Sequence, residues 1–147
     1  MKRLLVLSVI TVLSTAPILA QKSEVFSSSS KAIRGYDPVA YFTENKAVKG
    51  ADSIVFNWMD ANWYFSTKEN LTMFMASPEK FAPQYGGYCA YGCSEGHKAP
   101  TDPEAFTIVN GKLYLNYNMN VRTKWRQDTD KKIERADMQW QAIKDKE

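Results

Sequence analysis

The chain places its soft metal ligands in one short segment. Its only two cysteines, Cys89 and Cys93, and its only histidine, His97, follow one another at intervals of four residues. On an α-helix, at about 100° per residue, such positions stay within an arc of about 80° on one face. Thiolate and imidazole donors select Cu(I) or Zn(II). We therefore predict a metal site, for copper in preference to zinc, with Cys89 and Cys93 as thiolate ligands and His97 as the third ligand.

The third ligand requires a break in the helix. On a straight helix, His97 would lie about 12 Å along the axis from Cys89. One ion reaches all three side chains only if the helix ends near Gly96 and the chain folds back. Glycine tolerates the left-handed backbone that ends helices, so we expect a short helix over Tyr88 to Glu95, closed by Gly96.

Other interpretations of this segment stay open. A Cys89–Cys93 disulfide suits an oxidising compartment, but residues four apart on a helix have β-carbons about 5–6 Å apart, and a disulfide needs roughly 3.5–4.5 Å. The thiols could instead be small buried residues, with His97 incidental. A catalytic Cys–His pair is the last alternative, and Glu95 is the one nearby acid that could orient it. We expect no catalytic residues and no enzymatic activity.

The start of the chain has the pattern of a secretory signal peptide. Met1-Lys2-Arg3 is positively charged, Leu4 to Leu13 is almost entirely apolar, and a small residue, Ala20, stands at the expected cleavage position. The apolar run of about ten residues is too short for a bilayer span, which needs about twenty. We expect residues 1–20 to be removed on export, leaving a periplasmic or secreted protein without a stable membrane span.

The remainder is expected to be one domain. A polar, serine-rich stretch predicts a flexible lead-in over residues 21–31, and residues 32–145 then form the domain. The formal net charge of +3 includes Lys2 and Arg3, so the exported part is close to neutral. This balance excludes the basic surface of a nucleic-acid-binding protein. A metal ion is the expected partner, and a protein partner stays unidentified.

Two β-hairpins and several helices are predicted along the domain. The first hairpin has strands over 53–58 and 63–65 around a turn at 59–62. The second has strands over 106–109 and 112–115 around Asn110-Gly111, a dipeptide typical of tight hairpin turns. Helices are expected after a capping box at Ser66 and Glu69, from Pro78, and along the apolar stripe from Val121 to Ile143. The class is α+β: a small single domain of two hairpins packed against short helices, with a C-terminal helical segment.

Several motifs, in order, resemble the YHS-domain family and its exported bacterial branch, over nearly the whole stretch from Ala32 to Trp140. They are Asp37-Pro38-Val39, Trp63-Tyr64-Phe65-Ser66, Ser77-Pro78-Glu79-Lys80-Phe81-Ala82, Tyr85-Gly86-Gly87-Tyr88-Cys89-Ala90-Tyr91, Asp102-Pro103-Glu104 and Leu113-Tyr114-Leu115-Asn116-Tyr117-Asn118.

The resemblance implies a fold more than a function. Metal-handling members carry thiols after the Asp-Pro-Val turn and after the aromatic strand. This chain has Ala40, Ser66 and Asn70 at those positions, so the family's metal site cannot be carried over.

A second function of a different class stays open. The tyrosines of the central and C-terminal parts could line a pocket, since aromatic faces with a few hydroxyls are typical of small-molecule sites. The chain would then be a non-metal, aromatic-lined ligand-binding or interaction domain of unknown partner. The tyrosines concerned are Tyr85, Tyr88, Tyr91, Tyr114 and Tyr117.

Overall fold

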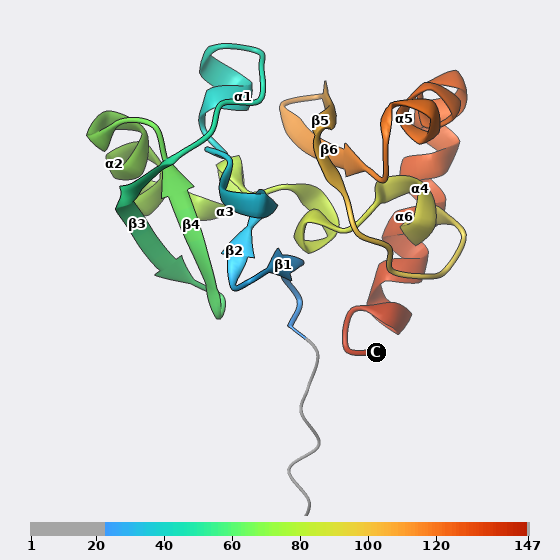
Figure 1. Ribbon diagram of the computed structural model, residues 1–147. Helices are drawn as coiled ribbons and strands as arrows, with labels where there is room; N and C mark the ends of the chain where they lie inside the picture. Colours follow the sequence, from blue (N-terminus) through green and yellow to red (C-terminus); the bar gives the residue numbers. More distant parts are fainter. Residues whose placement is uncertain (1–22, 147) are drawn as a thin grey trace, which may run out of the picture.

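Two β-hairpins form the framework of the computed structural model, which describes residues 23–146, and the α+β class is confirmed (Figure 1). The expected signal peptide lies outside the described residues. Strands β3 (Ala51–Trp58) and β4 (Ala61–Phe65) form the first hairpin, and β5 (Asp102–Val109) and β6 (Lys112–Asn116) form the second.

Both hairpin turns use left-handed backbone. Asn110 and Gly111 have φ of 51° and 73°, as the Asn-Gly dipeptide predicts. Met59 and Asp60 have φ of 51° and 58°, so the first turn is also tight. The predicted turn over 59–62 was therefore too long, because Ala61 and Asn62 already pair with β3.

The N-terminal segment belongs to the fold, which corrects the expected flexible lead-in from residue 23 onward. Strands β1 (Ser27–Ser28) and β2 (Lys31–Ala32) pair with each other, and β2 runs parallel to β4, giving the order β1-β2-β4-β3. Ser29 and Ser30 have φ of 52° and 62°, so the serine run makes a tight turn. Val25 is buried as well.

The helices are short except at the C-terminal end. Among residues 23–146, no helix is both long and apolar enough to cross a membrane. The helices are η1 (Ile33–Gly35), α1 (Ala40–Thr43), α2 (Lys68–Ala76), α3 (Pro78–Phe81), η2 (Gln84–Gly87), α4 (Ala90–Ser94), α5 (Met119–Trp125), η3 (Arg126–Asp128) and α6 (Thr129–Ile143).

The start of α2 corrects the predicted capping box. The N-cap is Thr67, whose side chain accepts a hydrogen bond from the Asn70 N–H at 3.1 Å. The Ser66 hydroxyl instead donates to Asp37 at 2.7 Å. The predicted cap residue, Ser66, therefore hydrogen-bonds to a carboxylate that is distant in sequence and does not cap the helix.

Strand β6 joins two core clusters. In Figure 1 the first sheet and α2 lie on one side, and the second hairpin lies with α4, α5 and α6 on the other. Leu113 and Leu115 pack in the first cluster, with Trp63, Phe65 and Phe74. Tyr114 packs in the second, with Trp125 and Ala136 among others. Successive side chains of a strand point to opposite faces, so one strand contributes to both clusters.

The backbone at Gly86, in η2, holds the N-terminal segment in place. The Phe26 N–H donates to the Gly86 carbonyl at 2.8 Å. A β-carbon on Gly86, which has φ of +61°, would lie 1.6 Å from the Glu24 carbonyl oxygen. Only glycine allows this backbone crossing.

Gly86→Ala is expected to destabilise the protein much more than Gly111→Ala. Both glycines have positive φ, but a β-carbon on Gly111 meets nothing within 4 Å. The Gly111 variant isolates the backbone cost of about 1–2 kcal/mol, and the Gly86 variant adds a clash worth about 2 kcal/mol or more. Urea unfolding measures both losses, and equal losses would contradict the proposed crossing.

Candidate functional site

The two cysteines flank the first turn of α4 (Ala90–Ser94). Cys89 is the N-cap, with its Sγ accepting a hydrogen bond from the Gly92 N–H at 3.5 Å. Cys93 lies inside the helix, and its N–H donates to the Cys89 carbonyl at 2.9 Å. Both thiols are free and buried, with exposed fractions of 2% and 0%. The helix is therefore shorter than the predicted span of Tyr88 to Glu95, because Cys89 has a non-helical backbone and caps the helix from outside.

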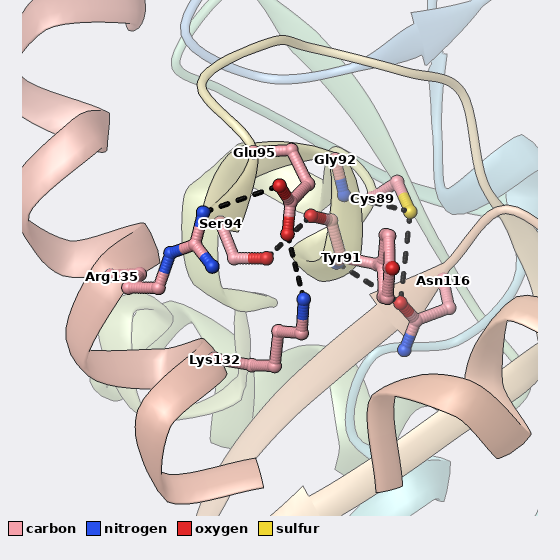
Figure 2. A network of polar contacts seen from close by, with 8 residues as sticks. All are labelled: Cys89, Tyr91, Gly92, Ser94, Glu95, Asn116, Lys132 and Arg135. Atoms are coloured by element: carbon pink, nitrogen blue, oxygen red, sulfur yellow. Dashed lines mark hydrogen bonds and ion pairs between the residues drawn. The ribbon is translucent and has the colours of Figure 1, made fainter. Parts of the chain in front are cut away.

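Asn116, at the end of β6, fixes the position of Cys89 (Figure 2). Its Oδ1 accepts hydrogen bonds from the Cys89 thiol at 3.6 Å and from the Tyr91 N–H at 3.1 Å. Asn116 is fully buried, and within the described part of the chain its Nδ2 has no hydrogen-bond partner. Sequence reasoning missed Asn116 as a site residue, although a polar residue closing the strand Lys112–Asn116 was an available signal.

Burial raises the pKa of both thiols. It raises the pKa of Cys89, an effect that the Gly92 N–H partly opposes. It raises the pKa of Cys93 to about 12, and charge on the neighbouring Cys89 adds to this rise, whereas Lys98 opposes it. The effect of Cys89 on the pKa of Cys93 indicates that the two thiols lie near one another. Cys89 and Cys93 thus form a buried dithiol, in which burial favours the protonated thiols over the thiolates.

The chain folds back after α4, but His97 does not join the thiols in a three-ligand group. Gly96 has φ of +85° and ends the turn, as predicted. The His97 N–H then donates to the Gly92 carbonyl at 3.1 Å, and the imidazole is exposed. Across residues 23–146, no three or more His, Cys, Asp and Glu side chains come together as a metal-holding group. Of the three predicted ligands, Cys89 and Cys93 lie one helical turn apart, and their role as metal ligands stays a prediction.

Glu95 anchors α4 to α6. Its carboxylate lies 2.7 Å from Lys132 Nζ and 3.2 Å from an Arg135 guanidinium nitrogen (Figure 2). The hydrogen bond from Lys132, followed by the charges of both cations, lowers the pKa of Glu95. Lys132 also lies over the Tyr91 ring, 4.1 Å from its centroid. The one acid near His97 in sequence is therefore held by cations of the C-terminal helix.

A second convergence of side chains surrounds Asp37, which is fully buried. One carboxylate oxygen accepts from the Val39 and Ala40 N–H groups at 2.9 and 3.3 Å. The other accepts from the Ser66 N–H at 2.8 Å, the Ser66 hydroxyl at 2.7 Å and Asn70 Nδ2 at 2.8 Å. Ala40, Ser66 and Asn70 are the positions at which the family resemblance implies thiols. Here they enclose a carboxylate.

Comparison with protein-family models, with curated proteins and with solved structures finds no match to this chain. The resemblance to the YHS-domain family stays a prediction from the motifs. The geometry of the dithiol and of its surroundings is therefore the basis for inferring function.

Asp37→Asn is expected to lower the free energy of unfolding by about 3 kcal/mol, because an amide nitrogen replaces an acceptor that faces several buried donors. Asp52→Asn is the matched control, since the Asp52 side chain is 88% exposed and pairs with Lys31 on the surface. The control is expected to change stability by less than about 1 kcal/mol. Urea unfolding measures both, and a similarly small loss for Asp37→Asn would contradict its role.

The raised pKa of Cys93 predicts a pH dependence of stability. The thiol titrates near 9 when unfolded and at about 12 when folded. The native state therefore holds this proton more tightly, so its contribution to stability is complete below pH about 9 and is lost as the pH rises toward about 12. We expect a shallower alkaline decline in unfolding free energy for Cys93→Ala than for the wild type. Parallel declines would show that the Cys93 thiol titrates normally.

Proposed function

We propose that the chain is an exported copper-binding module that holds Cu(I) between the thiolates of Cys89 and Cys93. The observation that carries this proposal is the free pair of thiols, one helical turn apart in a single buried environment. The sequence pattern of residues 1–20 supports the proposed export. Sequestration or transfer of the ion is the proposed activity.

The donor set favours Cu(I) over Zn(II). Cu(I) is a soft ion that two thiolates can bind, whereas structural zinc sites take four ligands. Binding would replace both thiol protons, which pass to solvent, and would leave a complex with a single negative charge. Lys98 supports such a charge, because its positive charge lowers the pKa of Cys93.

The surroundings of the dithiol suit a binding role. The Gly92 N–H already donates to Cys89 Sγ and would stabilise a thiolate there. Asn116 holds the same sulfur from the side of β6. An ion with only two ligands keeps room for a further donor, which is the feature that allows passage of the ion to a partner. His97 is exposed and is not required in this site.

Anaerobic titration of the reduced protein, residues 21–147, with Cu(I) against a competing chelator is expected to give one tight equivalent. The Cys89→Ser/Cys93→Ser variant should bind at least about 100-fold more weakly, a loss of about 2.7 kcal/mol. His97→Ala is the matched control and should bind within about threefold of the wild type. Circular dichroism confirms that each variant is folded.

Two results would overturn the proposal. One is the absence of binding by the folded wild type. The other is a loss in His97→Ala as large as that in the double-cysteine variant, which would restore the three-ligand site predicted from sequence.

A further inference from the structure

A groove of about 180 Å³ lies between the two halves of the molecule, apart from the dithiol. Trp58 and Met59, at the end of β3 and in its turn, line it from the first half. Trp140 of α6 lines it from the second half, and Glu24 and Glu79 also belong to the lining. The groove is smaller than the roughly 300–1,000 Å³ of pockets for drug-sized ligands, so it suits a small molecule.

Three indoles line the groove, and the two partly exposed ones, Trp58 and Trp140, pack against separate core clusters. Trp58 contacts Trp63 and Phe74, with ring centroids 5.6 and 5.7 Å apart. Trp140 contacts Tyr85 and Tyr88 at 5.8 and 6.2 Å. Both tryptophans are only partly buried. Each ring is therefore fixed by its neighbours and retains surface for a ligand.

The backbone also fixes the lining. The Trp63 Nε1–H donates to the Trp58 carbonyl at 2.9 Å, which anchors the end of β3. The contact of Phe26 with Gly86 holds the adjacent Glu24 at the groove. The site is preorganised, and little ordering would be needed on binding.

The charge of the groove is negative. Its lining contains two ionisable carboxylates, those of Glu24 and Glu79, and its other side chains are aromatic, aliphatic or uncharged polar. The Glu24 carboxylate forms an ion pair with Lys144, whose Nζ lies 3.6 Å away. Both side chains are partly exposed. Glu79, on α3, is exposed. Aromatic faces with nearby carboxylates form the arrangement that attracts organic cations.

We infer that this groove binds a small organic ammonium ion, with the cation against the indoles of Trp58 and Trp140 and with Glu79 as its principal counter-charge. The inference goes beyond the proposed copper site and does not depend on it. Cation–π attraction supplies about 0.5–2 kcal/mol per contact, so recognition by charge as well as by shape is expected.

Calorimetric titration of the mature chain with choline tests the inference. The control ligand is the uncharged analogue in which carbon replaces the ammonium nitrogen, because it has the same shape without the charge. We expect saturable binding of choline and at least about tenfold weaker binding of the analogue, which corresponds to about 1.4 kcal/mol.

Variants separate the charge from the apolar surface. Glu79→Gln should weaken choline binding about threefold or more without affecting the analogue, and its exposure makes a folding defect unexpected. Lys80→Gln, next to it and outside the lining, is the matched control and should not weaken binding. Trp140→Leu should weaken choline binding by about tenfold, with folding checked separately.

Equal binding of choline and its analogue would overturn the inference and leave an apolar groove without charge selectivity. Absence of saturable choline binding by the folded wild type would overturn it as well. The Cys89→Ser/Cys93→Ser variant should bind choline as the wild type does, so failure of the copper site and failure of the groove are distinguishable.

Discussion

The carboxylate of Asp37 is the constraint on which the first half of the fold depends. A buried charge is costly unless each of its lone pairs is used, and here donors from the Asp-Pro-Val turn, from Ser66 and from Asn70 use them together. These donors belong to separate stretches of chain. Satisfying the carboxylate therefore fixes α1, the end of β4 and the start of α2 relative to one another. Tyr41 extends this arrangement, because its hydroxyl donates to the Pro103 carbonyl at 3.0 Å.

A buried polar side chain also fixes separate stretches of chain around the second hairpin. Asn116 is a buried polar side chain at the end of a strand, and it fixes the start of α4 through Cys89 and Tyr91. Strand β6 connects the two arrangements, since its leucines belong to the first core cluster and Tyr114 to the second. The thiols thus lie where the second hairpin meets the C-terminal helices. The positions around Asp37 that could have held thiols serve stability instead.

Local chemistry explains which elements could be predicted from sequence. The Asn110-Gly111 turn, the start of α3 at Pro78 and the end of α4 near Gly96 depend on backbone preferences of single residues, and all agree with the structure. Pairing of residues 27–32 with the first sheet depends on a partner strand about thirty residues later, and a polar serine run gives no local sign of it.

In the candidate site too, features set by neighbouring residues could be predicted, and features set by contacts distant in sequence could not. The Cys93 N–H donates to the Cys89 carbonyl, so the two cysteines lie one turn apart, although Cys89 is the N-cap and not part of the predicted helix. The spacing of His97 suggested a third ligand, but it could not show that the returning chain leaves the imidazole exposed. Asn116 was missed because its contact with Cys89 joins residues 27 positions apart. Ser66 was wrongly predicted to cap α2, because its hydroxyl donates to the Asp37 carboxylate, 29 positions earlier.

The atoms that coordinate bound copper distinguish the two-thiolate site from every alternative. X-ray absorption spectroscopy at the copper edge, on the mature protein loaded anaerobically with Cu(I), reports the atoms that surround the ion. Binding by two thiolates predicts sulfur neighbours alone, from Cys89 and Cys93, with an edge typical of low-coordinate Cu(I). Imidazole scattering from His97, or a first shell without sulfur, would contradict the two-thiolate site.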